Sequence, residues 1–493
     1  MNSQRIAVIG AGMAGLVAAL ELACRGLQVT LLERADTPGG KLRELEIDGR
    51  RLDAGPTVLT LREVFDEVFA RAGSTLAQHV MLRPLDVLAR HAWADGGVLD
   101  LHADAGRSAD AIGRFAGAAE ARGFIAFTRD AARIHRTLDA SFMRAQRPDP
   151  LTLSLRAGVS ILGIRPFSTL WSSLCGYFRD HRLRQLFGRY ATYCGSSPFE
   201  APATLMLVAH VEQRGVWTVD GGLHALARAL ATLCAQRGVT LRYGSHVERI
   251  ALRAGRVTGI ELAGGETLPC DAVVLNGDVS ALAAGCFGDA VRRAAPADGP
   301  PPARSLSALT CNLVAETHGF PLHRHNVFFS SDYAAEFNDL MQHHRLPRRP
   351  TVYICAQDRP DGDGEHGERL FCLVNAPADA GRASADDAAV HRCARAARAL
   401  LARCGLRIDL DPARCQVTTP RDFDRLFPAS AGALYGAASH GWRAAFRRPG
   451  ARSRVPGLYL AGGSVHPGPG LPMAALSGQL AAACLLDDIG RKT

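Results

Sequence analysis

The strongest constraint on the fold is a glycine motif near the start of the chain. It follows an apolar segment at residues 5–9 that is predicted to form a strand. Three glycines then stand in G-x-G-x-x-G spacing, at Gly10, Gly12 and Gly15. An Ala- and Leu-rich segment suited to a helix comes next, and a second apolar strand is expected at residues 29–32. The order strand, glycine turn, helix, strand predicts a βαβ unit of the Rossmann type.

Each position in this motif has a physical task. Gly10 permits the tight turn, Gly12 lets the backbone approach a pyrophosphate, and Gly15 lets helix and strand pack closely. The helix would then offer the N–H groups of its first residues, Met13 and Ala14, to the phosphates. The motif therefore predicts a dinucleotide site, with a glycine-rich turn in an ordinary α/β domain as the weaker alternative.

An acidic residue completes the nucleotide signature. Glu33 ends the second strand, 18 residues after Gly15, where a carboxylate can accept hydrogen bonds from ribose hydroxyls. Arg34 follows it and is also expected to contact the cofactor. These residues do not distinguish NAD from FAD.

A second glycine motif favours FAD. Gly39-Gly40-Lys41 follows the acidic strand end closely. This spacing resembles the two-dinucleotide-binding-domain flavoproteins, which include amine oxidases, Rab-escort-type proteins and carotenoid desaturases. In that group the glycine pair brings a second backbone segment to the cofactor, so Gly40 and Lys41 are expected to contact FAD. Lys41 is one of only two lysines, with Lys492; a chemical role and neutral drift are both open explanations.

Composition limits the classes of function. With 493 residues the chain can form two or three domains, and its charge of +9 would suit an anionic membrane surface, nucleic acid or simple solubility. The arginines are spread out and no zinc-finger or RNA-binding signature occurs, so nucleic acid is not an expected partner. Thirteen scattered cysteines without a C-x-x-C pair or metal-ligand spacing predict no metal site and a reducing cytoplasm.

A long stretch without charged residues, at 455–486, raises the question of a membrane span. Four prolines and many glycines interrupt it, so it cannot be one spanning helix. Irregular backbone without charge suits a buried cofactor pocket better.

The chain is expected to leave the first domain and return to it. The predicted fold class is α/β, with a discontinuous Rossmann-like FAD-binding domain and a mixed α+β substrate domain. The FAD-binding domain is assigned residues 1–105, 215–285 and 420–493, and the substrate domain residues 106–214 and 286–419. Beyond the helical region at 106–185, the expected helices are 62–73, 224–237 and 385–405. The expected strands are 240–243, a hairpin at 247–262, and 270–276, 307–315, 351–356 and 370–375.

The apolar segment at residues 151–178 has two interpretations. It could be an amphipathic helix pair that lines a lipid entrance, as in peripheral membrane enzymes, or a core helix of the second domain.

The C-terminal motif narrows the family. Residues 456–472 read PGLYLAGGSVHPGPGLP and resemble the signature of the bacterial-type carotenoid desaturases. In many other flavoproteins the corresponding strand ends in Gly-Asp or Gly-Glu, whereas here it ends in Gly462-Gly463-Ser464, so an amine oxidase is less favoured. The resemblance implies a strand, a Gly/Pro turn and a helix beginning near Met473. That helix would point its N–H groups at the flavin.

Further motifs extend the resemblance over almost the whole chain, at residues 53–56, 193–198, 221–222 and 276–278. It implies that the following residues also contact FAD: Gly55, Pro56, Thr57, Val247, Gly462, Gly463, Leu471 and Met473. Only one dinucleotide fingerprint occurs, so electrons would leave to oxygen or a quinone.

Residues 188–193, GRYATY, are similar to the subgroup that desaturates 1-hydroxy- and methoxy-carotenoids at the 3,4 bond. The resemblance implies an FAD-dependent oxidoreductase acting on CH–CH groups, on the route to spheroidene and spirilloxanthin in a phototrophic bacterium. Its substrate would be a carotenoid polyene. The enzyme would be cytoplasmic and peripherally bound to the inner or intracytoplasmic membrane.

The catalytic residues are the least determined part. His466 in the signature turn and Tyr193 are the candidates; a turn-shaping histidine and a packed core tyrosine are the alternatives. His224 is expected to be structural and Asp278 a helix cap. A phytoene-type desaturase, a flavin-dependent carotenoid isomerase and a non-enzymatic lipid-escort protein remain the competing functions.

Overall fold

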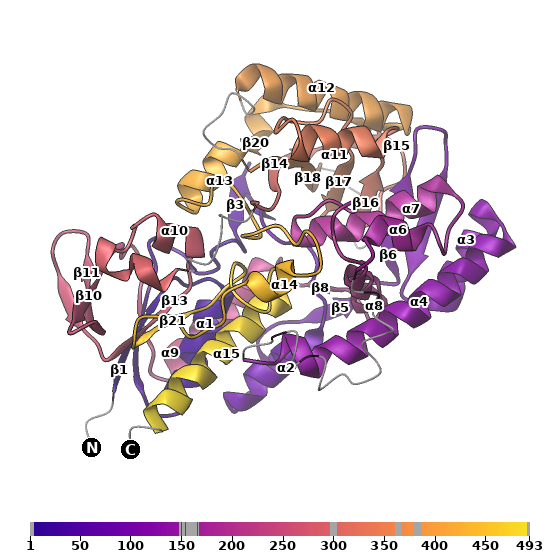
Figure 1. Ribbon diagram of the computed structural model, residues 1–493. Helices are drawn as coiled ribbons and strands as arrows, with labels where there is room; N and C mark the ends of the chain where they lie inside the picture. The colour runs from indigo at the N-terminus through magenta and orange to yellow at the C-terminus, as the bar shows by residue number, and fades with distance from the viewer. Residues whose placement is uncertain are drawn as a thin grey trace.

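The computed structural model describes residues 4–146, 149, 153, 165, 167–295, 303–359, 367–378 and 386–490. Two sheets organise this part of the chain (Figure 1). Most of residues 151–166, where the amphipathic helix pair was expected to begin, lie outside the described residues.

The first sheet has five strands, and all its neighbours pair in parallel. Across the sheet the order is β21 (Leu458–Leu460), β13 (Ala272–Leu275), β1 (Arg5–Ile9), β2 (Gln28–Leu32) and β9 (Thr240–Arg242). The strand β13 reads Ala-Val-Val-Leu and is buried throughout, as parallel strands covered on both faces are. The strand and helix order confirms the Rossmann-like fold.

Alternate residues of this sheet pack against different layers, as the two-residue period of a strand requires. In β1, Ile6 and Val8 pack against helices, while Ala7 and Ile9 pack against a small antiparallel sheet. The helices are α1 (Met13–Ala23), α2 (Arg62–Arg71), α9 (His224–Gln236) and α15 (Leu471–Gly490). The small sheet contains β10 (Val247–Arg253), β11 (Arg256–Leu262) and β12 (Thr267–Pro269).

Helices α1 and α15 are in close contact. A Cβ atom on Gly478 of α15 would lie 2.3 Å from the carbonyl oxygen of Ala14 in α1. Only glycine allows this approach, which brings the first helix and the last one to the same side of the sheet (Figure 1).

The second sheet has seven strands and is mixed. Its order is β20 (Cys415–Thr418), β14 (Ser307–Ala315), β18 (Glu368–Ala376), β17 (Val352–Ala356), β16 (His325–Phe328), β6 (Val87–Ala92) and β7 (Val98–His102). Strands β6 and β16 pair in parallel, and the other described neighbours pair antiparallel. Three short antiparallel pairs complete the strands: β3 (Glu44–Ile47) with β4 (Arg50–Asp53), β5 (Leu82–Pro84) with β8 (Trp217–Val219), and β15 (Thr317–Gly319) with β19 (Leu406–Ile408).

The faces of the second sheet differ in their surroundings. Ile354 of β17 belongs to a core with Leu400 and Leu401 of α12 (Asp387–Arg403). Tyr353, its neighbour in β17, points to the other face and lines a cavity. The alternation therefore assigns one face of the sheet to a helix-covered core and the other to a cavity wall.

Aromatic side chains dominate the core beside that cavity, including Phe124, Phe127 and Phe187. The surrounding helices are α3 (Ala105–Ala116), α4 (Ala118–Leu138), α6 (Leu170–Leu174), α7 (His181–Gly188), α8 (Leu207–Gln213) and α11 (Tyr333–Met341). Short helices α10 (Val279–Ala283), α13 (Pro420–Leu426) and α14 (Ala444–Arg447) lie in the connections. Within the described ranges, no helix combines the length and apolar character needed to cross a bilayer.

The structure differs from the expected domain boundary at residue 105. Strands β6 and β7 pair into the seven-stranded sheet, so residues 87–102 lie with the second sheet rather than the nucleotide-binding one. No local pattern in the sequence indicates this, because β6 pairs with β16 more than 230 positions later.

Candidate functional site

One continuous cavity of about 1240 Å³ connects the two sheets. Its lining includes the glycine turn and Glu33, and it also includes Phe167 and Trp442. All the predicted cofactor contacts line it except Gly15, and so does Tyr193, whereas His466 does not. The cavity thus places a nucleotide-type cradle and an apolar chamber in one space.

The glycine turn is shaped by close backbone contacts. Gly10 has φ +96°, and a Cβ there would lie 2.5 Å from the carbonyl oxygen of Asn276. A Cβ on Gly15 would lie 2.0 Å from the Gly10 oxygen, so Gly15 serves the packing of helix on strand. Gly12 borders the cavity itself, and its Cβ would lie 2.9 Å from Asn276 Nδ2.

Asn276 fastens the turn to the end of β13. The Gly15 N–H donates to its Oδ1 at 2.6 Å. The N–H groups of Met13 and Ala14 belong to the first turn of α1, where the helix itself supplies no acceptor, and both residues line the cavity. The helix thus presents free donors to a phosphate.

Glu33 is held firmly at the end of β2. Its Oε2 accepts from the Ala11 N–H at 2.7 Å, and its Oε1 accepts from the Ala35 N–H at 2.9 Å. A carboxylate has about four lone-pair positions, so it keeps capacity for ribose hydroxyls. Arg34 instead donates to the Leu426 carbonyl at the end of α13.

The second glycine motif lies directly against the first. The Gly39 N–H donates to the Ala11 oxygen at 2.8 Å, and a Cβ on Gly40 would lie 3.1 Å from the Gly12 Cα. Lys41 donates from Nζ to the Leu434 oxygen at 2.6 Å, and burial lowers its pKa. Its amine therefore anchors a distant loop to the cavity wall.

The segment at residues 53–57 crosses beside Lys41. A Cβ on Gly55 would lie 2.0 Å from the Lys41 oxygen, which explains the glycine. Thr57 Oγ1 shares a hydrogen bond of 2.7 Å with the Tyr353 hydroxyl, and that hydroxyl lies 2.7 Å from His325 Nδ1. Burial lowers the pKa of His325 to about 3, so the imidazole is neutral at pH 7.

The C-terminal turn brings a second helix start to the cavity. Gly462 has φ +122° and donates to Ser477 Oγ at 3.1 Å. Helix α15 begins at Leu471, two residues before the predicted position, and both Leu471 and Met473 line the cavity. The two helix starts favour an anionic or electron-rich ligand.

Arg448 supports this turn and was not anticipated from the sequence. Its guanidinium donates to the carbonyl oxygens of Tyr435, Gly463 and Ala437 at 3.0, 3.0 and 2.8 Å. Burial lowers its pKa. No local motif marks it, because its three partners come together only in the folded chain.

The catalytic candidate His466 lies outside the cavity. It is buried, its Nε2 lies 3.0 Å from the Phe142 oxygen, and burial lowers its pKa to about 4. Because it does not reach the cavity, the geometry favours the turn-shaping alternative.

Three other residues named in the sequence analysis have clear positions in the structure. Val247 lines the cavity at the start of β10. His224 holds the Pro38 oxygen at 2.8 Å, and Asp278 caps α10. The last two contacts agree with the structural tasks expected of these residues.

Tyr193 belongs to a polar cluster in the cavity wall. Its hydroxyl donates to Glu212 Oε1 and accepts from Arg189 Nη2 at 3.2 Å. Tyr190 donates to Glu212 Oε2 at 2.6 Å. The sequence marks GRYATY only as a family motif and does not reveal Glu212, whose partners lie about twenty positions earlier.

The residues present fit FAD. The bare backbone at Gly12 and Gly40, the free helix start of α1 and the fixed carboxylate of Glu33 match a pyrophosphate and a ribose. The C-terminal turn and α15 lie along the same cavity, where the ring system would be held.

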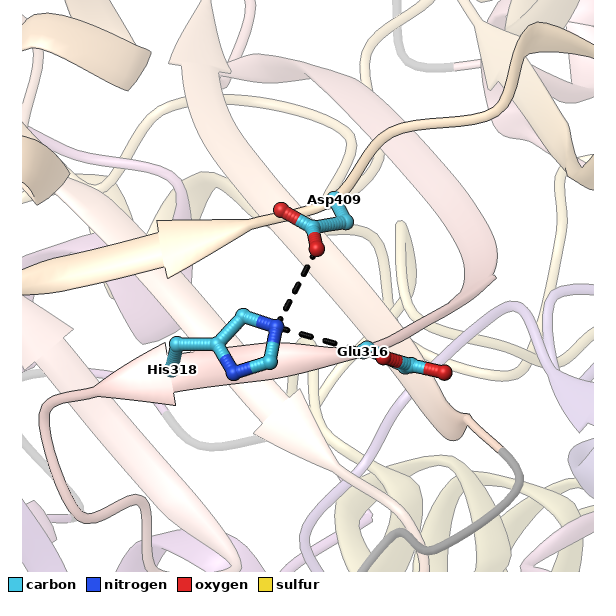
Figure 2. Close-up of side chains that lie close together, drawn as sticks. All are labelled: Glu316, His318 and Asp409. Atoms are coloured by element: carbon cyan, nitrogen blue, oxygen red, sulfur yellow. Dashed lines mark hydrogen bonds and ion pairs between the residues drawn. The ribbon is translucent and has the colours of Figure 1, made fainter.

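A separate cluster lies at the edge of the β15–β19 pair. Figure 2 shows Glu316 and Asp409 approaching the same nitrogen of His318, with Nε2 3.1 Å from Asp409 Oδ2 and 3.9 Å from Glu316 Oε2. Both carboxylates are exposed. We interpret the group as a surface ion pair and assign no metal site to it.

Comparisons with known proteins agree with this geometry. The family model described as flavin containing amine oxidoreductase matches residues 13–486. The hydroxyneurosporene desaturase of Rubrivivax gelatinosus is 54% identical over 99% of this chain and 94% of its own length. The hydroxyneurosporene desaturase of Cereibacter sphaeroides is 46% identical over 99% of both chains.

Among solved structures, a fatty acid isomerase from P. acnes has a TM-score of 0.58 at 14% identity, covering 98% of both chains. At that identity the likeness concerns the fold alone. The family model and the sequence relatives show that the chain belongs to the flavin-containing amine oxidoreductase family, as an FAD-dependent member of its carotenoid desaturase branch.

Proposed function

We propose that this protein is an FAD-dependent desaturase that acts on an acyclic 1-hydroxylated carotenoid at its C3–C4 bond. The observation that carries the proposal is the continuous cavity, which joins a dinucleotide cradle to an apolar chamber. The two relatives at 54% and 46% identity bear the name of hydroxyneurosporene desaturases, and the competing phytoene-type, isomerase and escort functions are less well supported.

The apolar chamber suits a polyene, which offers few groups for charge recognition. Burial of apolar length contributes about 25 cal/mol per Å², and the chamber supplies side chains such as Val208, Val327 and Phe371. FAD supplies the hydride acceptor when it is bound. The chain's own residues hold the polyene in register, exclude water and fix the glycine turn through Asn276.

The cavity mouth suits a lipid surface. Phe167 is 79% exposed and packs edge-on against Trp442, with ring centroids 5.6 Å apart. Arg443 lies over the Trp442 ring at 4.9 Å. Aromatic rings beside exposed cations suit an anionic membrane interface, so we propose that the protein binds the cytoplasmic membrane surface peripherally and draws its substrate from there. Oxygen or a quinone would accept the electrons.

The substrate is tested with vesicles that contain either 1-hydroxyneurosporene or phytoene. The protein is expected to lengthen the conjugated system of the hydroxylated polyene and shift its absorption to longer wavelength. Conversion of phytoene with no action on the hydroxylated compound would overturn the assignment.

Membrane binding is tested by sedimentation with anionic vesicles. The Phe167→Asp and Trp442→Asp variants should each sediment less than wild type. Met81→Asp is the control, because Met81 is 61% exposed but does not line the cavity. Equal sedimentation of all four proteins would contradict the proposed docking site.

A further inference from the structure

The wall of the apolar cavity contains a charged cluster that a hydrocarbon does not need. Arg189, Tyr193 and Glu212 all line the cavity, and Tyr190 lies behind them in the core. The Arg189 guanidinium lies 5.2 Å from the centre of the Tyr193 ring. Placing charged groups at an apolar surface costs free energy, so the cluster calls for a polar ligand.

Arg189 has unused donors. Its Nη2 donates to the Tyr193 hydroxyl, while its buried Nε has no hydrogen-bond partner. Among the described residues no carboxylate lies within ion-pair distance of Arg189, since the Tyr193 hydroxyl stands between it and Glu212. A guanidinium with five N–H groups thus keeps capacity for an acceptor in the cavity.

The cluster lies close to the cofactor turn. A Cβ on Gly195, two residues after Tyr193, would lie 2.5 Å from Tyr435 Cδ2. The Tyr435 oxygen accepts from Arg448, whose guanidinium also donates to the Gly463 oxygen. A short chain of contacts therefore connects the cluster to the C-terminal turn.

We propose that Arg189 and Glu212 bind the hydroxyl group of the substrate and so determine its specificity. This inference rests on the proposed function. An alcohol can accept a hydrogen bond and donate another, which matches a guanidinium donor and a carboxylate acceptor on the two sides of the Tyr193 hydroxyl. In a 1-hydroxylated substrate only C2 separates the hydroxyl-bearing carbon from C3, so a group that holds the hydroxyl must lie near the reacting bond.

The position of the cluster meets this requirement. A hydroxyl bound at Arg189 determines which carbons of the polyene lie beside the flavin. Without such a contact the rest of the polyene could shift along the apolar cavity, because its carbons are alike. Arg189 and Glu212 are thus binding residues that fix the register of the substrate.

The test compares 1-hydroxyneurosporene with 1,2-dihydroneurosporene, the same polyene without the hydroxyl. Wild type, Arg189→Met and Arg189→Lys are assayed for kcat/KM and for Kd, the latter by quenching of flavin fluorescence. Both variants should lose about tenfold to a hundredfold of the preference for the hydroxylated polyene, mainly through Kd and KM. Lysine keeps the charge but not the planar fork of donors.

Arg184→Met is the matched control. Arg184 lies on α7, which ends directly before Arg189; it stacks on Trp171 and has a buried Nε without a partner, but it does not line the cavity. The Arg184→Met variant should keep the wild-type preference for the hydroxylated polyene. The FAD content of each purified variant confirms that it is folded. If the cluster were purely structural, the Arg189 variants would bind both polyenes more weakly by the same factor.

Failure of this inference and failure of the proposed function give different results. Wild type that binds the two polyenes equally, or Arg189 variants that keep the wild-type ratio of Kd values, would overturn this inference. Desaturation of phytoene alone would overturn the proposed function, while the ratio of Kd values still decides the role of Arg189.

Discussion

At the scale of single residues, the cofactor cradle depends on side chains that are missing. Gly12 borders the cavity, and Gly40 approaches its Cα so closely that neither tolerates a bulky side chain. Asn276 stabilises the turn directly. Its side-chain oxygen accepts a hydrogen bond from the Gly15 N–H and thereby fixes the direction of α1.

We expect Gly12→Val to abolish FAD binding. The new side chain would occupy the pyrophosphate position, and its Cβ would collide with Asn276 Nδ2 at 2.9 Å. The ratio of flavin to protein absorbance in the purified variant measures the effect. Gly113→Ala, where the nearest atom is 3.6 Å away, is the control and should retain full flavin. Full occupancy in Gly12→Val would disprove the assignment of the first motif.

At the scale of elements, α11 is attached to the second sheet by a buried carboxylate. Glu336 accepts from the Thr351 N–H at 3.0 Å and from its hydroxyl at 2.6 Å. Burial nevertheless raises the pKa of Glu336 to about 7. The folded state therefore binds its proton more tightly than the unfolded state does.

The sign of the pH dependence follows from this shift. Between pH 4.5 and pH 7, Glu336 is protonated to a greater extent in the folded protein than in the unfolded one. The free energy of unfolding therefore decreases as pH rises through this range, by about 3 kcal/mol in total. Glu336→Gln should remove that dependence, and its stability relative to wild type should be greater at pH 8 than at pH 5. Urea denaturation at both pH values measures it, with exposed Glu248→Gln as control. The prediction would be contradicted if the free energy of unfolding changed by the same amount between pH 5 and pH 8 in Glu336→Gln and in wild type.

How far the sequence predicts these elements depends on how local their causes are. Strand β1 has the predicted bounds and α9 ends one residue early, because apolar runs and glycine turns mark them directly. The hairpin expected at residues 247–262 is formed by β10 and β11, which turn at Ala254-Gly255. Strand β6 and the cluster of Arg448 with its partners were not predictable, since they depend on contacts that only the folded chain creates.

At the scale of the whole molecule, one segment connects the two sheets. Asp53 ends β4, and its carboxylate accepts from the N–H groups of Leu223 and His224 at the start of α9. Its backbone N–H and oxygen are both held by the side chain of Gln357, which follows β17. Asn312 of β14 donates to the same oxygen at 3.0 Å. The cavity therefore keeps its shape through a few buried amides.

We expect Gln357→Ala to destabilise the protein by about 2 kcal/mol, because it leaves a buried backbone N–H without its acceptor. Flavin should also dissociate more readily, since the two walls of the cavity are then less firmly joined. Urea denaturation and equilibrium dialysis of FAD measure these effects. Gln416→Ala, at an exposed position of β20, is the control, and equal stability of the two variants would contradict the role given to Gln357.

The strand order of the parallel sheet has a consequence for biosynthesis. Strand β1 leaves the ribosome first, but its neighbour β13 pairs on its other side with β21, which is made more than 450 residues later. Helix α15, which packs against α1, follows later still. We therefore expect FAD to bind stably only after β21 and α15 have been synthesised, because the turn and the helix start that follow β21 form one wall of the cofactor cradle.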